Sequence, residues 1–308
     1  MSATPVQLLL PPLRHWPRPL PQRIAQALGR ADRVDAFGDA LDVPASAALS
    51  RLGEGDLDID QIRAYRWLRA EPAWIRPDIN GARLYAVGAM LPMDANDVTS
   101  FVPELQALFD DASYQLQAVT PHRWYLRMPR DVVVPRFATP ATVLGADPFD
   151  HIPEGEGARD WRVLDNEVQI TLHQHLRNLE RQQRGLPPIN ALWWWGDSEL
   201  PDPMQGLIPT IHSDDPLLHG LALTANMQPT ALPIHWPDHA EGLYDLQGVA
   251  RDNIYERWLE PALDSMEKGM AMQWICEEGP VFDMRNTQRW RLWRGSFQLP
   301  DIITDMQE

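Results

Sequence analysis

The sequence predicts an α/β fold with a central, mostly parallel sheet flanked by helices and a small α+β unit inserted into it. Largely apolar runs such as VQLLL (6–10) and INALWWWG (189–196) are typical of strands covered on both faces. Helical patterns alternate with these runs, and a hairpin-rich stretch stands apart from them. We therefore expect a core domain from residues 1–70 and 131–308, and an α+β insertion at 71–130.

Composition restricts the classes of partner. The 308 residues carry a formal net charge of −16, so the surface repels phosphate backbones and nucleic acid is not an expected partner. Cys276 is the single cysteine, which excludes an intrachain disulfide and a cysteine metal site and fits a reducing compartment. No apolar run reaches the roughly 20 residues of a membrane-spanning helix, and the first residues do not resemble a signal peptide. We expect a cytoplasmic protein without a membrane partner.

The first 130 residues contain most of the expected strands. VQLLL should be a buried strand ended by Pro11 and Pro12, followed by a helix over 21–28. In the insertion, AWIRPDI and ARLYAVGAML should pair through the turn Asn80–Gly81. DANDVTSFVPELQALF (94–109) has helical spacing, and YQLQAV and RWYLRM should form a second strand pair.

The strongest helical pattern covers residues 160–185. Asp160 is the expected N-cap, and Gly185 should end the helix. The inward stripe is Trp161, Leu164, Val168, Leu172, Leu176 and Leu179. INALWWWG should follow as a strand, with Trp193 and Trp195 on one face and Trp194 on the other. The three tryptophans indicate either a strand covered on both faces or the wall of a binding site.

Near the C-terminal end we expect a helix over 249–267 that Pro261 kinks or restarts. MAMQWIC (270–276) and VFDM (281–284) should form a hairpin, and RWRLWR (289–294) a third strand. The arginines of that last strand could hold an anion, although a solvated strand face explains them equally well.

His175 falls on the apolar face of the long helix, whereas His173 falls on the opposite side, so the two cannot chelate one ion. His175 is therefore either a hydrogen-bonded, half-buried histidine or a functional group facing the sheet. Glu167 and Asn178 lie at the edge of that face and could orient it.

Two loops combine imidazole and carboxylate groups that could bind zinc or manganese: 211–220 and 235–242. The residues are His212, Asp214, Asp215, His219, Asp238 and His239. Their spacing matches no compact ligand motif, and Ser-Asp-Asp-Pro is also an ordinary turn or helix start. A metal site requires the two loops to meet in space. No nucleophile elbow, phosphate-binding glycine loop or His-Glu-x-x-His motif occurs.

The segment LDNEVQITLHQH and the following RGLPPINALWWWGDSELP resemble the bacterial RpfE-type regulatory proteins, a phosphoglycerate mutase-like family. The matching residues are Asn166, Glu167, His175, Asn178, Arg184, Gly185, Leu186, Pro187, Pro188, Asn190, Trp193, Gly196, Leu200 and Pro201. More distantly, the chain is similar to archaeal-type cofactor-independent phosphoglycerate mutases of the alkaline-phosphatase superfamily. That resemblance implies a reduced alkaline-phosphatase-like core with a two-metal phosphoryl-transfer site.

The departures from that family concern its metal ligands. Where the family's first strand ends in a metal-binding Asp, this chain has Pro11 and Pro12. The family's Asp-Glu-Ala-Gly-His ligand motif has no counterpart here, and two-metal catalysis requires such ligands. Trp195 and Ser198 stand where the family has an Arg and a Gly.

We therefore expect a non-catalytic regulatory or binding protein, a pseudoenzyme on a degenerate mutase-like scaffold, with no catalytic residue and no cofactor. It would bind a protein partner or a small anionic ligand. The expected binding residues are Glu167, His175, Asn178, Asn190, Trp194, Trp195, Asp197 and Ser198. The alternative is an active mutase or phosphatase that holds two manganese or zinc ions through the six residues of the two loops. A structural subunit that assembles through its tryptophans is the second alternative.

Overall fold

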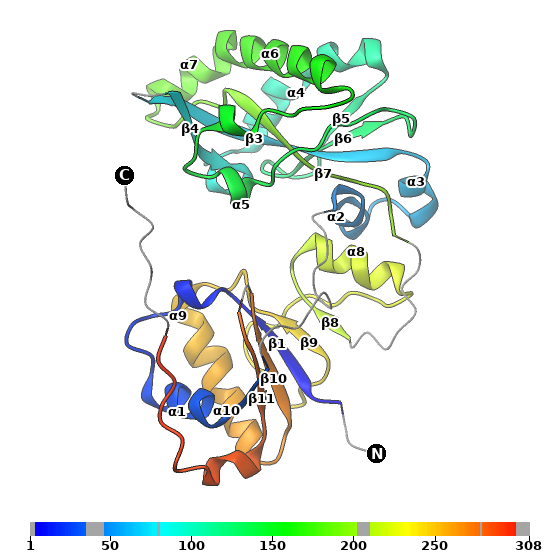
Figure 1. Cartoon of the computed structure of the whole chain (residues 1–308). Coiled ribbons are helices and arrows are strands. Elements are labelled where there is room, and N and C mark those ends of the chain that lie inside the picture. The colour runs from blue at the N-terminus through cyan, green and yellow to red at the C-terminus, as the bar shows by residue number, and fades with distance from the viewer. Residues whose placement is uncertain (1–3, 35–45, 79–80, 202–209, 278, 300–308) are drawn as a thin grey trace. The chain divides into compact units, whose positions relative to one another are not determined.

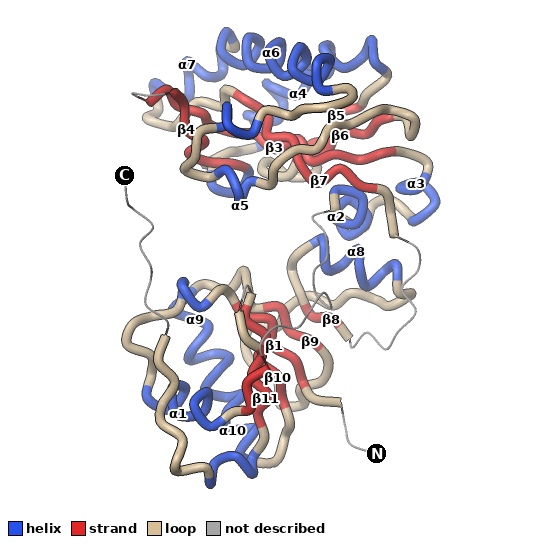
Figure 2. Tube along the Cα trace, viewed as in Figure 1, coloured by secondary structure: helices blue, strands red, loops and turns tan. Residues whose placement is uncertain are grey.

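The computed structural model describes residues 4–34, 46–78, 81–201, 210–277 and 279–299. The chain divides into two compact units, one from 1–43 and 203–308 and the other from 44–202 (Figures 1 and 2). None of the described helices combines the length and the apolar character that a membrane span needs. Each unit is an assembly of helices on a sheet, so the predicted α/β class is confirmed.

The first unit contains a six-stranded sheet in the order β2-β11-β10-β1-β9-β8. Its strands are β1 (Val6–Leu10), β2 (Asp32–Val34), β8 (Ile211–His212), β9 (Leu243–Asp245), β10 (Met272–Cys276) and β11 (Val281–Met284). Its helices are η1 (Leu13–His15), α1 (Gln22–Arg30), α8 (Pro216–Thr224), α9 (Arg251–Ile254), the π-helical η5 (Tyr255–Leu259), α10 (Glu260–Glu267) and η6 (Asn286–Trp290). Strands β8, β9, β1 and β10 are parallel, and β11 and β2 continue the sheet antiparallel.

Alternation along β1 builds a core on each face of this sheet. Leu8 and Leu10 pack into the cluster that includes Leu28 of α1 and Leu263 of α10. Leu9 points the other way, into the cluster that includes Leu218 of α8. Successive strand residues point to opposite faces, so three consecutive leucines are buried here because both faces of the sheet are covered.

The second unit contains an antiparallel sheet in the order β4-β3-β6-β5, with β7 paired to β3. Its strands are β3 (Arg66–Asp78), β4 (Gly81–Val87), β5 (Gln115–Ala118), β6 (Trp124–Met128) and β7 (Ala191–Ser198). Its helices are α2 (Ala47–Gly53), α3 (Ile59–Arg63), η2 (Gly88–Met90), α4 (Ala95–Phe109), η3 (Asp110–Ala112), α5 (Pro140–Val143), η4 (Pro148–His151), α6 (Ala158–Gln174) and α7 (Leu176–Gln183). Helices α4 and α6 cover one face of the sheet, where Phe101 and Val168 share a core with Trp194 (Figure 1).

This division differs from the predicted domains. The insertion was expected to end at residue 130, yet the compact unit runs from Pro44 to Asp202. Helix α6 and strand β7 belong with the hairpins, because β7 pairs with β3 from Trp67↔Ser198 to Ala73↔Ala191. The turn expected at Asn80–Gly81 falls partly outside the described residues, but β3 and β4 on either side of it do pair.

Three local predictions were wrong. The helix expected over 160–185 begins after Gly157, not Asp160, and breaks at His175, whose ψ of 129° is extended. The INALWWWG strand lies in an antiparallel sheet and not in the parallel one. RWRLWR forms the end of η6 and a turn, because Arg291 and Arg294 bind Asp32 and so hold the segment against β2. Pro261 does mark a new start, since it lies in the first turn of α10.

Candidate functional site

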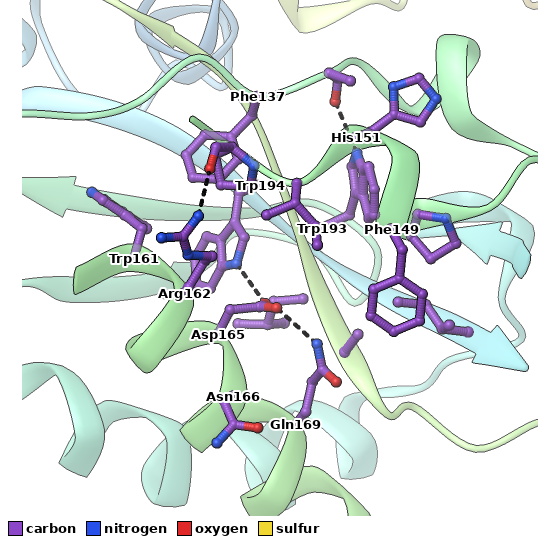
Figure 3. A pocket seen from close by; sticks show the side chains of 17 residues that line it. Phe137, Phe149, His151, Trp161, Arg162, Asp165, Asn166, Gln169, Trp193 and Trp194 are labelled. Atoms are coloured by element: carbon purple, nitrogen blue, oxygen red, sulfur yellow. Dashed lines mark hydrogen bonds between the residues drawn. The ribbon is translucent and has the colours of Figure 1, made fainter. Parts of the chain in front are cut away.

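A cavity of about 250 Å³ lies in the second unit between α6, strand β7 and the segment 137–153 (Figure 3). Strand β7 forms ladder bonds only with β3 among the described strands, so its other edge is open toward this cavity. An open edge explains why Trp193 and Trp194 both line the cavity although they point to opposite faces of the sheet.

Aromatic rings form most of the cavity wall. Trp161 and Trp194 meet edge to face at 5.5 Å between ring centroids, and Phe137 meets Trp161 in the same way at 5.4 Å. Trp193 donates its indole N–H to the carbonyl oxygen of Ala138 at 3.0 Å, which fixes the ring on the other side of the cavity. Phe149 of η4 is 64% exposed and lies at the rim. Such walls favour a flat or apolar ligand body.

Asp165 of α6 is the acidic group of the cavity. Its Oδ1 accepts the indole N–H of Trp194 at 2.9 Å, and its Oδ2 accepts Nε2 of Gln169 at 2.7 Å (Figure 3). Burial raises the pKa of Asp165 above its ordinary value, and the two hydrogen bonds oppose this shift. A carboxyl group with a perturbed pKa inside an aromatic cavity is a feature of functional sites.

Trp194 is the one expected binding residue that lines the cavity. Glu167 is exposed on α6 and does not line it. His175 is buried, packs on Phe101 at 4.6 Å, and accepts the backbone N–H of Arg177 at Nδ1 (3.0 Å). Its Nε2 lies 3.1 Å from the carbonyl oxygen of Ser100, so both ring nitrogens have partners and the histidine caps α7.

Two asparagines of the expected set hold backbone together. Asn178 donates to the carbonyl oxygens of Leu172 and Ile189, each at 2.7 Å, and accepts the N–H of Ile189 at 2.9 Å. Asn190 makes the same kind of pair with Ile75, accepting its N–H at 2.9 Å and donating to its carbonyl oxygen at 2.7 Å. Both amides use their donors and acceptors within the fold.

The remaining three residues bind neighbours outside the cavity. Trp195 donates to Glu71 at 3.2 Å and stacks against the guanidinium of Arg69, 4.9 Å from the ring centroid. Asp197 forms a two-pronged ion pair with Arg66, at 2.5 and 2.7 Å. The Ser198 hydroxyl lies 2.7 Å from that of Ser46. The structure therefore separates Trp195, Asp197 and Ser198 from Trp194.

Sequence reasoning missed Asp165 and Gln169. A signal was present, since Asp165 lies four residues after Trp161 and thus falls on the inward stripe of the helix. A carboxylate on an apolar stripe needs hydrogen-bond partners, and Gln169, four residues further on, is placed to supply one.

The six residues of the metal alternative do not assemble into a metal site. Asp215 caps α8, Asp214 accepts the N–H of Leu232, and His219 binds the carbonyl oxygen of Ser213 at 2.6 Å. The His212 ring stacks on that of Tyr244 at 4.4 Å. Asp238 and His239 are exposed. Within the part of the chain that the structure describes, no three His, Cys, Asp or Glu side chains are grouped to hold a metal ion.

The carboxyl ends of β8 and β9 do bring together one polar pair that the sequence analysis did not single out. The Ser213 hydroxyl donates to Oδ2 of Asp245 at 2.7 Å, and both residues are buried. Burial raises the pKa of Asp245, and the nearby Asp214 and Asp215 act in the same direction. This is the edge of a parallel sheet at which α/β proteins bind ligands.

Comparisons with known proteins point to one class of enzyme. A probable 2,3-bisphosphoglycerate-independent phosphoglycerate mutase of Geobacter sulfurreducens is 29% identical over 93 residues, 29% of this chain and 23% of that protein. A 2,3-bisphosphoglycerate-independent phosphoglycerate mutase of Methanothrix thermoacetophila is 28% identical over 113 residues, 35% of this chain and 28% of that protein. The chain therefore matches about a quarter of the length of these relatives. No family model matches the sequence.

Two solved structures resemble the chain more loosely. They are a cofactor-independent phosphoglycerate mutase from Thermoplasma acidophilum (15% identity, TM-score 0.36, 91% of this chain and 89% of that one) and the PH0037 protein from Pyrococcus horikoshii (12% identity, TM-score 0.46, 92% and 88%). At these TM-scores the fold assignment rests on the sheet topology of the chain itself. The sequence matches agree with the mutase-like resemblance, whereas the RpfE-type assignment stays a prediction.

Proposed function

We propose that this chain is a non-catalytic regulatory or binding protein on a phosphoglycerate mutase-like scaffold, and that it binds a small molecule in the cavity beside β7. The observation that carries the proposal is Asp165, which two neutral donors hold at the wall of an aromatic cavity. Ligand sites in proteins are concave and mostly apolar, with a few placed polar groups that orient the ligand. This cavity has that composition, and its volume of about 250 Å³ suits a ligand smaller than most drugs.

The regulatory part of the proposal follows from the RpfE-type resemblance around Asn166 and Glu167. These two residues of α6 directly follow Asp165, and Asn166 lines the cavity whereas Glu167 does not. A ligand bound there would contact α6 and β7 together. Ligand binding would stabilise this arrangement and could thereby control recognition of a protein partner.

Besides the similarity to phosphoglycerate mutases, the enzyme alternative is supported by the Ser213–Asp245 pair at the carboxyl ends of the parallel strands. A hydroxyl beside a carboxylate at this edge is where a phosphoryl-transfer nucleophile would lie. The ligand groups that the alternative requires are not assembled among the described residues. We therefore rank the enzyme second.

Ligand-observed NMR with a set of small aromatic fragments tests the proposed site. Phe149→Ala removes an exposed ring at the rim without disturbing the core, and we expect it to weaken fragment binding severalfold. Trp290→Ala, which removes an equally exposed ring from the first unit, is the matched control and should have no effect. If the fragments bind Phe149→Ala, Trp290→Ala and the unaltered protein with equal affinity, the ligand site lies elsewhere.

A further inference from the structure

The carboxylate of Asp165 has no cationic partner among the residues that the structure describes. Its two contacts are neutral donors, the indole of Trp194 and the amide of Gln169. Each carboxylate oxygen can accept a further hydrogen bond, so the group retains acceptor capacity toward the cavity. Asp165 is half-buried, and a carboxylate that is withdrawn from water is normally paired with a cation, because burial of an isolated charge is costly.

Arg162 also lines the cavity but forms no ion pair with Asp165. It is the one Arg or Lys among the described residues that line the cavity. Its Nη1 donates to the carbonyl oxygen of Pro153 at 3.4 Å, and its side chain is exposed. His151 of η4 is the other titratable basic group of the lining, and no hydrogen bond joins it to Asp165. The cavity therefore contains a carboxylate that the protein does not neutralise.

The aromatic rings of the wall complement such a carboxylate. The faces of Trp and Phe rings attract cations through the ring quadrupole, and Trp does so most strongly. The lining offers Trp193 on one side and Trp161 with Phe137 on the other (Figure 3). A carboxylate together with several aromatic rings is the combination by which proteins recognise ammonium groups.

We infer that the cavity binds a small organic cation, an ammonium group on a compact apolar or aromatic body, with Asp165 as its counter-ion. This inference rests on the proposed function and names the ligand class of the same site. The ligand then has the opposite charge to the small anion expected from the sequence.

Three probes of nearly equal shape test the charge: benzylamine, benzyl alcohol and benzoate, titrated into the full chain by calorimetry near neutral pH. We expect benzylamine to bind saturably and at least about tenfold more tightly than the other two. Asp165→Asn should remove this preference. Asp160→Asn, which removes an exposed carboxylate from the same helix, should leave it intact.

The outcomes separate the inference from the proposed function. If benzyl alcohol or benzoate binds as tightly as benzylamine, and Phe149→Ala weakens that binding, the cavity is a ligand site but the cation assignment is overturned. If none of the three binds at concentrations up to about 10 mM, the inference fails. The proposed function is tested separately by the aromatic fragment set. It fails as well if no fragment binds in a way that Phe149→Ala weakens. The comparison of probes needs no variant, so it decides the question even if Asp165→Asn does not fold.

Discussion

The indole Nε1 of Trp194 donates a hydrogen bond to Oδ1 of Asp165 at 2.9 Å, and this bond joins the middle of the tryptophan triplet to helix α6. The neighbours of Trp194 bind differently: Trp193 donates to the carbonyl oxygen of Ala138 and Trp195 to the carboxylate of Glu71. All three indole donors have hydrogen-bond partners, as expected for tryptophans that are buried or half-buried. Trp194 thus belongs to the core, Trp193 forms part of the cavity wall, and Trp195 belongs to a separate polar network with Glu71.

Trp194→Phe should raise the pKa of Asp165 further. The indole hydrogen bond favours the ionised carboxylate and so lowers its pKa, and a phenyl ring removes that bond while keeping an aromatic side chain. Carboxyl-carbon NMR titration measures the change. Trp193→Phe is the control, since its indole bonds Ala138, and it should leave the pKa of Asp165 where it is. An unchanged pKa in Trp194→Phe would contradict the role given to the indole.

Asp165→Asn should stabilise the protein near neutral pH. The pKa of Asp165 is raised in the folded state, so its favourable contribution is complete below the unfolded pKa and is lost as the pH rises through the folded value. At neutral pH the carboxylate is therefore a net cost that asparagine removes. We expect Asp165→Asn to have a higher Tm than the unaltered protein near neutral pH, measured by differential scanning calorimetry.

The pH dependence of Tm shows whether the higher stability of Asp165→Asn comes from removing the charge of Asp165. The stabilisation by Asp165→Asn should shrink as the pH is lowered, because Asp165 then becomes protonated in both states. Asp160→Asn on the same helix should shift Tm little at any pH, since that side chain is exposed. A loss of stability in Asp165→Asn at neutral pH would show that the carboxylate is compensated within the fold.

Asn178→Ala should destabilise the protein by about 2–4 kcal/mol, because it removes the side-chain partner of the buried N–H and carbonyl group of Ile189 and one of the two hydrogen bonds to the Leu172 carbonyl. Urea denaturation measures the change. Asn166→Ala on the exposed side of α6 is the matched control and should stay within about 0.5 kcal/mol. Equal effects of the two substitutions would refute the structural role assigned to Asn178.

Arg69→Met should destabilise the protein by about 3–5 kcal/mol, because it leaves the buried carboxylate of Glu71 without its cation. Arg130→Met breaks an exposed pair with Glu199 and should cost less than about 1 kcal/mol. A double variant that also replaces Glu71 by Leu should recover most of the loss. Benzylamine binding should survive in any folded variant of this network, since neither Arg69 nor Glu71 lines the cavity.

The apolar pattern of the sequence identified elements such as β1, in which the core covers both faces of the strand. The consecutive leucines Leu8, Leu9 and Leu10 indicated β1, because each side chain meets a core on its own face of the sheet. The helix predicted over 160–185 was too long, because the apolar pattern continues beyond the point at which α6 ends. Leu176 and Leu179 continue the apolar stripe of α6, yet they are 74% and 55% exposed, since the extended backbone at His175 turns α7 onto a new axis.

Sheet partners and the candidate site depend on tertiary contacts that local patterns do not encode. The run Leu192–Trp193–Trp194 is as apolar as a parallel strand, and its antiparallel pairing with β3 is set by residues more than 100 positions away. The cavity exists because the segment 137–153 lies against the open edge of β7. The sequence marked Trp194 as a binding residue but paired it with Trp195, and only the fold shows that Asp165 is its partner.

The most direct test of a non-catalytic binding protein is a turnover measurement on the full chain. The protein is incubated with 3-phosphoglycerate and manganese, and the products are read by phosphorus NMR after removal of the metal. We expect the substrate resonance to persist alone, as in a parallel sample of the double variant Ser213→Ala and Asp245→Asn. Formation of 2-phosphoglycerate or inorganic phosphate that this double variant abolishes would contradict the account and establish the enzyme.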